Sequence, residues 1–180
     1  MRGLLRLCAI AAVAAPAFAL AQGPAPTVAI VDFQQVVRES AALGTVRAQV
    51  ETLRKSHEAE ALESERRLRD LDQALARDRE VLDETAFDAK RRDFEREFVA
   101  ARNAVQARQQ RMEQAYNAAM REIEKTIVTV TSDIARTQNI NIVFGRNAIV
   151  IAETNYDITQ QVLRQLNAEL PSVTVQTAQN

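Results

Sequence analysis

The feature that most constrains the fold is the absence of helix breakers from the middle of the chain. No glycine lies between Gly44 and Gly145, and no proline lies between Pro26 and Pro171. The same stretch is rich in Arg, Glu, Asp, Ala, Gln and Leu, a composition typical of long helices and coiled coils. The sequence therefore predicts an extended helical rod rather than a globule.

Apolar residues recur every three or four positions along this stretch, as in helices with one apolar face. The pattern stops after Leu82 and resumes at Phe87. Between them, Thr85 with Asp88 three residues later resembles a new helix start, with the acid near the helix N-terminus. Two long helices with a short break predict an antiparallel hairpin whose tip lies near residues 83–86.

The predicted tip also fixes which residues face each other across the hairpin. Residues at equal distances before and after the tip should meet, which pairs apolar Val46 with apolar Ile123. The same register pairs Asp78, an acidic residue on the apolar seam, with the basic Arg91. We predict that this ion pair specifies the register; the alternative is that both charges point separately into water.

The middle of the seam contains small or polar residues where large apolar ones would pack better. Ala61 and Ser64 lie on the first arm, and Ala101 lies on the second. Small side chains fill less of the space between two helices, so these layers should pack more weakly than the ends near Val46 and Ile127. We therefore expect the middle of the hairpin to be the more flexible part.

Short apolar runs rich in β-branched residues flank the rod and predict strands. Val28–Val31 precedes it, and Ile140–Phe144 and Ala148–Ile151 follow it. Gly145-Arg146-Asn147 joins the last two runs, so we expect a β-hairpin there. Val173–Val175 predicts a further short strand.

Two short helices are marked by capping patterns. In a capping box, the side chain of the capping residue and that of a Glu or Gln three residues later each bond the other's backbone amide. The pairs Asp32 with Gln35 and Asp157 with Gln160 have this spacing. Ser40–Gly44 is the predicted joint between the first of these helices and the rod.

If the hairpin folds back, the strands at both ends of the sequence meet in one small body. We expect a mostly α fold with a small β part: a body of residues 22–44 and 138–180, and a projecting hairpin tentacle of residues 45–137. Exposed strand edges on so small a body predict oligomerisation. The candidate oligomerisation residues are the apolar residues of these strands: Val28, Ile30, Val31, Ile142, Phe144, Ile149 and Ile151.

The N-terminus has the pattern of a cleaved export signal, which we place at residues 1–21. A basic start precedes the apolar run Leu7–Ala15, which is too short to anchor in a bilayer. Ala19–Ala21 gives the small-x-small pattern of a cleavage site, and Ala17–Ala19 is the rival. We therefore expect the protein to be exported.

The mature chain offers little catalytic chemistry. Cys8, the only cysteine, is lost with the signal, and His57, the only histidine, falls on the hairpin seam, where packing explains it better than catalysis. No glycine-rich loop could cradle a nucleotide phosphate. We predict a non-enzymatic protein with no catalytic residue, cofactor or metal ion. Losing the two signal arginines leaves a slightly acidic mature chain, which argues against nucleic-acid binding.

Two surface features have competing interpretations. The basic clusters Arg66–Arg69 and Lys90–Arg92 could touch an acidic partner, but a solvated helix face explains them more simply. Phe87, Phe94 and Phe98 could form a binding stripe for another chain, but their helical spacing favours the hairpin core.

The order of these segments resembles the Skp/OmpH family of periplasmic chaperones. Three segments carry the resemblance: Val28–Asp32 after the signal, Thr137–Phe144, and Asp157–Leu163, with the long charged hairpin between the first two. It covers essentially the whole mature chain.

The resemblance implies a periplasmic homotrimer whose bodies join through their strands. Its three hairpins would surround a cavity that holds unfolded outer-membrane β-barrel proteins without ATP. The acidic mature chain departs from the strongly basic members of the family, which argues against lipopolysaccharide or membrane-surface binding. The alternative function is a structural coiled-coil spacer or adaptor in the cell envelope.

Overall fold

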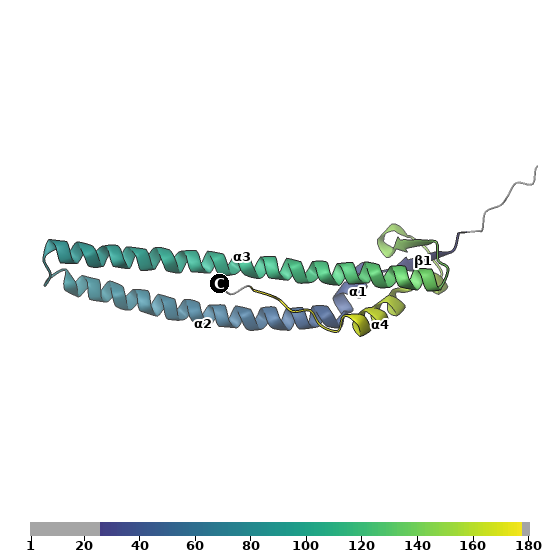
Figure 1. The fold of residues 1–180 in the computed structure, drawn as a ribbon, viewed down its shortest axis with the longest axis horizontal. Coiled ribbons are helices and arrows are strands. Elements are labelled where there is room, and N and C mark those ends of the chain that lie inside the picture. The colour runs from purple at the N-terminus through teal and green to yellow at the C-terminus, as the bar shows by residue number, and fades with distance from the viewer. Residues whose placement is uncertain (1–25, 178–180) are drawn as a thin grey trace, which may run out of the picture.

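The computed structural model describes residues 26–177, so the expected signal and its cleavage sites lie outside the described residues. An elongated pair of helices projects from a small body that both ends of the described chain build together (Figure 1). Among residues 26–177, no helix is long and apolar enough to cross a membrane.

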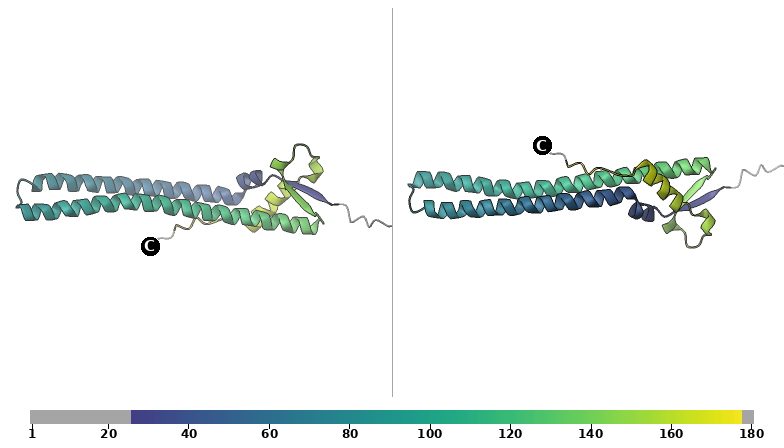
Figure 2. Two further views of the ribbon diagram at one scale, coloured as in Figure 1. Left: turned by 90° about the horizontal axis from the view of Figure 1, so that it is seen from above. Right: turned by 90° about the horizontal axis from the view of Figure 1, so that it is seen from below.

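The two long helices are α2, Ala41–Asp78, and α3, Glu84–Thr137, which lie antiparallel along most of the molecule (Figures 1 and 2). Helix α3 has 54 residues against 38 for α2, and its C-terminal part packs into the body. The predicted helical hairpin is confirmed.

The tip lies a few residues earlier than predicted. Helix α2 ends at Asp78, and Asp83, rather than Thr85, caps α3 by accepting a hydrogen bond from the Ala86 amide at 2.9 Å. Helix α3 can begin earlier because an aspartate side chain satisfies an amide at the helix start as well as a threonine does. The connection is therefore 79–83, in place of 83–86.

The base of α2 is fixed by one buried serine. The Ser40 hydroxyl accepts from the Leu43 amide at 3.1 Å and donates to the Val37 carbonyl at 2.9 Å. Helix α2 consequently starts at Ala41 and contains Gly44, so the predicted joint of five residues is a single capping residue.

The first short helix, α1, spans Phe33–Glu39 and is capped as predicted by Asp32, whose carboxylate accepts from the Gln35 amide at 2.8 Å. The second predicted hydrogen bond of the capping box, from the Asp32 amide to the Gln35 side chain, is wrong. The Gln35 side chain bonds Glu39, and the Asp32 amide donates to the Thr159 hydroxyl at 2.8 Å. This contact ties α1 to the C-terminal part of the chain.

The sheet consists of two parallel strands, β1, Val28–Val31, and β2, Ile142–Gly145, with Ile30 opposite Phe144. The predicted β-hairpin of Ile140–Phe144 with Ala148–Ile151 is wrong. A tight hairpin turn requires a positive φ, whereas φ is −70° at Gly145. The chain instead forms a 3₁₀ turn, η1, Arg146–Ala148.

The last helix, α4, spans Thr159–Glu169 and follows the 3₁₀ turn η2, Thr154–Tyr156. It begins two residues later than predicted, because Asp157 accepts from the Thr159 amide at 2.8 Å instead of forming a capping box with Gln160. The Ile158 amide donates to the Ile30 carbonyl at 2.9 Å, so this segment covers the second edge of β1.

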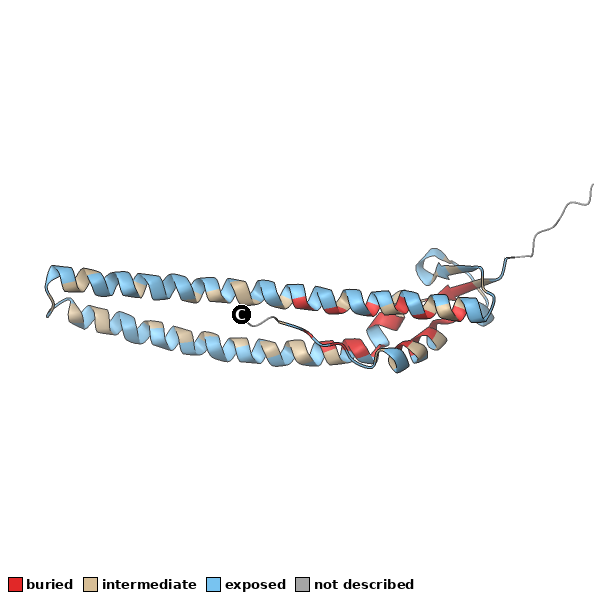
Figure 3. Ribbon diagram, viewed as in Figure 1, coloured by how far each residue is buried: buried red, intermediate tan, exposed pale blue. Residues whose placement is uncertain are grey.

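The hydrophobic core lies almost wholly at the body end of the molecule (Figure 3). Its largest fully buried side chains come from α1, α2, α3 and α4: Val36, Val46, Ile123, Ile127, Val130, Val162 and Leu166. Between Val46 and Ala115 no residue is fully buried. Two arms with no enclosed core therefore extend from a packed base.

The C-terminal segment that follows Pro171 does not form the predicted strand. Val173 and Val175 are buried, but their backbone groups bond side chains of α2 rather than another strand. The segment runs back along the hairpin in the direction of the tip (Figures 1 and 2).

Candidate functional site

The seam between α2 and α3 is under-packed in its middle, as predicted. A cavity of about 550 Å³ opens there, lined among others by Ala61, Ser64 and Ala101. A second cavity of about 480 Å³ lies closer to the body, where Val50, His57, Ala61, Val105 and Met112 are among its lining residues. Ala61, Ser64 and Ala101 have small side chains, which fill less of the space between the two helices.

His57 lies half-buried against the second of these cavities, among apolar side chains. In residues 26–177 no group of three His, Asp or Glu side chains is placed to hold a metal ion. The placement fits the expected packing role of His57.

The phenylalanine stripe contributes to the seam unevenly. Phe87 and Phe94 are half-buried, as expected for core residues. The Phe94 and Phe98 rings stack with centroids 6.4 Å apart, but Phe98 is 51% exposed and lines the larger cavity. The core interpretation is therefore wrong for Phe98, because the small Ala101 layer leaves its ring uncovered on one side.

The predicted ion pair between Asp78 and Arg91 is wrong. Asp78 Oδ2 instead accepts from Lys90 Nζ at 2.6 Å, while Arg91 pairs within its own helix with Asp88 and Glu95. The residue that faces Asp78 on α3 is therefore one position earlier than predicted, Lys90 in place of Arg91. The side chain of Asp78 is 27% exposed, so the pair is partly shielded.

Two further ion pairs cross the hairpin. Arg108 reaches Glu60 at 2.8 Å, and Arg67 reaches Glu97 at 3.5 Å. Glu60 and Arg108 are displaced from Asp78 and Lys90 by the same number of residues, so these two pairs share one register. The Arg67–Glu97 pair departs from it and is a diagonal contact between the two arms. The basic clusters are thus partly engaged on the hairpin itself, which favours the solvated-face interpretation.

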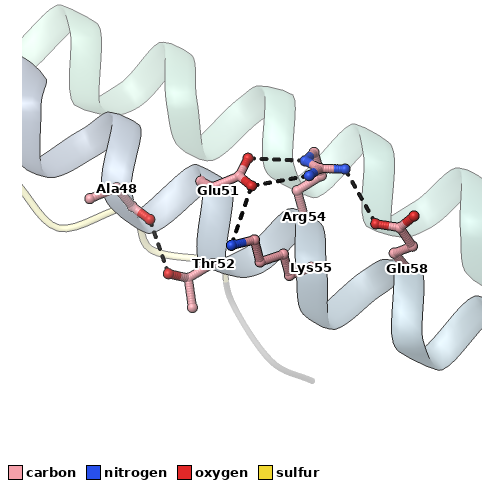
Figure 4. A network of polar contacts seen from close by, with 6 residues as sticks. All are labelled: Ala48, Glu51, Thr52, Arg54, Lys55 and Glu58. Atoms are coloured by element: carbon pink, nitrogen blue, oxygen red, sulfur yellow. Dashed lines mark hydrogen bonds and ion pairs between the residues drawn. The ribbon is translucent and has the colours of Figure 1, made fainter.

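Other charges form networks along the surface of a single helix, as around Arg54 (Figure 4). Its guanidinium pairs with Glu51 at 3.0 Å and Glu58 at 3.3 Å, and Lys55 also reaches Glu51 at 3.7 Å. The hydrogen bond from Arg54 lowers the pKa of Glu51, and Glu51 in turn raises the pKa of Arg54. Because these groups are solvent-exposed, they stabilise the helix only slightly.

The seven candidate oligomerisation residues divide into two groups. Ile30 and Val31 are buried in the protomer, and Val28 and Ile149 are half-buried. Ile142, Phe144 and Ile151 are exposed, by 41%, 40% and 88% of their surface.

Sequence analysis missed two members of the exposed apolar surface at the body. Val150 is 94% exposed and Tyr156 is 44% exposed. Tyr156 lines a groove of about 560 Å³ together with Phe144 and Ile151, among others. Val150 lies in the same apolar run as Ile149 and Ile151. Because every residue of that run is apolar, the sequence could have indicated Val150 as well. Exposed apolar side chains at this end of the molecule therefore come from β2, from the segment after η1 and from η2.

The chain belongs to a known family, whose model, "Outer membrane protein (OmpH-like)", matches residues 27–166. The match covers the sheet, the hairpin and most of α4, which are the elements that define this fold.

A solved structure has the same fold. It is a protein from Caulobacter crescentus CB15 described as a "putative outer membrane chaperone (OmpH-like)". The two chains are 23% identical and superpose with a TM-score of 0.73 over 84% of this chain and 90% of the other. No curated protein sequence matches the chain. The family match and the shared fold agree with each other.

Proposed function

We propose that this protein is an ATP-independent periplasmic holdase that keeps unfolded outer-membrane β-barrel proteins soluble. Three copies associate through their bodies, and their hairpins enclose a cavity for the client. The observation that carries the proposal is a difference in packing along the molecule. The base has a buried core, whereas the arms contain no fully buried residue between Val46 and Ala115. Family membership supports the same role.

The exposed apolar surface at the body supports the assembly. Strand β1 has both edges bonded, by β2 and by the segment at Asp157, whereas in the described part of the chain β2 pairs only with β1. An open edge beside exposed Phe144, Val150 and Ile151 would expose a monomer to aggregation. Association of copies through residues 28–38 and 138–168 would cover it.

The arms support holding without an energy source. Their seam exposes partly covered apolar side chains such as Phe98 and Val105, which can make many weak contacts with an unfolded chain. Three arms around one client raise the effective concentration of each contact, so no single contact must be tight. Loose packing lets the arms adapt to clients of different volume.

The test is dilution of a urea-unfolded outer-membrane β-barrel protein into buffer with the purified mature protein, without ATP. A holdase keeps the client in the supernatant in proportion to its own concentration. A coiled-coil spacer leaves the client to precipitate as it does in buffer alone, and that result would reject the proposal. Export is tested separately by N-terminal sequencing of the protein recovered from the periplasm, which should begin after the signal.

A further inference from the structure

The C-terminal segment is held by an unusual set of contacts from one face of α2. The Gln49 side chain donates from Nε2 to the Val173 carbonyl at 2.7 Å and accepts from the Val175 amide at 2.9 Å. One turn earlier, the Thr45 hydroxyl accepts from the Val173 amide at 3.3 Å. A helix side chain thus bonds an extended backbone in the way that a neighbouring strand would.

The side chains of the segment alternate as in a strand. Val173 and Val175 are 3% and 7% exposed and belong to the hydrophobic core, while Thr174 between them is exposed. Val50 of α2, next to Gln49, packs partly buried against the same core. The polar contacts of the site reach only backbone atoms of the segment, so they do not depend on which side chains the segment carries.

The hairpin next to this site is open rather than filled. Val50 and Tyr116 line the cavity of about 480 Å³ at its body end, and the cavity continues toward the tip along Met112 and Ala61. A chain longer than the tail could therefore occupy the tail's position and extend over further apolar surface.

We propose that the groove held by Thr45 and Gln49 is a binding site for an extended client segment, and that the C-terminal tail occupies it as a built-in competitor. This inference rests on the proposed function, since it names where and in what conformation a client binds. Alternation of apolar and polar residues over about ten positions is the pattern of a transmembrane β-strand. The tail carries a short version of that pattern and is tethered beside the groove by α4, which keeps its effective concentration high.

The competition is tested on the mature protein with a tail-release variant, V173D/V175D. Buried charge expels the tail, while every groove residue on α2 remains. The matched control is T174D, which adds a charge at an exposed position of the same segment. Circular dichroism should show unchanged helix content for both, because α2, α3 and α4 supply the helices.

The probe is a fluorescein-labelled peptide with the sequence of residues 171–177, followed by anisotropy. If the tail is docked most of the time, release should tighten peptide binding about tenfold over the unchanged chain and T174D. Adding Gln49→Ala to the release variant should abolish the increase in peptide affinity. A peptide with both valines replaced by aspartate should not bind. Equal peptide affinity in the unchanged chain and the release variant overturns the proposal.

A second measurement uses the unchanged mature chain and so does not depend on a variant that folds. The amides of Val173 and Val175 are hydrogen-bonded and should exchange slowly; adding an unfolded β-barrel client should speed their exchange. Continued protection with client bound overturns the competition while leaving the holdase function intact. Client precipitation in the presence of the protein rejects the holdase function, whatever the peptide result.

Discussion

Lys90 donates from Nζ to Asp78 Oδ2 at 2.6 Å, joining the last residue of α2 to the first two turns of α3. The pair closes the hairpin just below its tip, and the Glu60–Arg108 pair repeats the same register farther down. If one arm slid along the other, each of these charges would face a different residue and lose its partner. The two ion pairs therefore favour the observed alignment of α2 and α3.

Removing one partner of the tip pair should cost little stability, because Lys90 is 54% exposed. We expect Asp78→Asn to lower the free energy of unfolding by less than about 1 kcal/mol. The swap D78K/K90D should recover most of that loss, measured by urea unfolding. Arg91→Gln is the control, since Arg91 pairs only within α3. A loss in R91Q larger than that in D78N would contradict the assignment.

The packed base of the hairpin should be far more sensitive than its surface. Ile127 is completely buried, so Ile127→Ala should lower the free energy of unfolding by about 2–5 kcal/mol through lost burial and a residual cavity. Its neighbour Val128 is 61% exposed, and Val128→Ala should change the free energy by less than about 0.5 kcal/mol. Similar thermal midpoints for the two variants would contradict the placement of the core.

The Ser40 cap should matter more than an ordinary surface hydroxyl. Ser40 is buried and bonds both the end of α1 and the start of α2, so Ser40→Ala should cost about 1–2 kcal/mol. Thr52→Ala is the matched control, because its hydroxyl bonds only the preceding turn of α2 and is exposed. Thermal unfolding of both variants checks this, and an unaffected S40A would show that the cap is dispensable.

Packing along the hairpin should appear as graded hydrogen exchange. Residues 57–66 and 101–110 line the two seam cavities and contain no fully buried residue. Residues 123–134 contain buried Ile123, Ile127, Val130 and Ile134. The first two segments should exchange faster than the third, because their local opening exposes less apolar surface. Uniform protection along both arms would refute this.

Sequence patterns predicted the elements whose determinants are local. The lack of glycine and proline between Gly44 and Gly145 predicted the hairpin, and Asp32 predicted the cap of α1. The tip was misplaced by a few residues because Asp83 and Thr85 are both good capping residues. The predicted register was closer, since the residue facing Asp78 is Lys90, one position from Arg91.

The errors concern contacts between residues far apart in sequence. Strand β2 pairs with β1, and this parallel pairing across the whole hairpin replaced the expected local turn at Gly145. The tail has a strand-like pattern, but its partner is the side chain of Gln49, which no strand pattern reveals. Such pairings depend on how the hairpin brings its two ends together.

The assembly prediction follows from the exposed apolar surface of the body. Replacing Val150 and Ile151 by aspartate places charge on side chains that are 94% and 88% exposed, so each protomer should fold normally. The double variant V150D/I151D should lose self-association, and light scattering should report the mass of one chain instead of three. V99D is the control and should assemble normally, because Val99 is 54% exposed on the arm of α3, far from the body. If V150D/I151D still forms a trimer, the interface does not lie at Val150 and Ile151, and the prediction is contradicted.

The most direct measurement is the mass of the soluble complex formed when the mature protein meets an unfolded outer-membrane β-barrel protein without ATP. Size-exclusion chromatography with light scattering should give one species that contains three copies of this chain and one client. A client that precipitates while this protein elutes alone at the mass of a single chain would contradict the account.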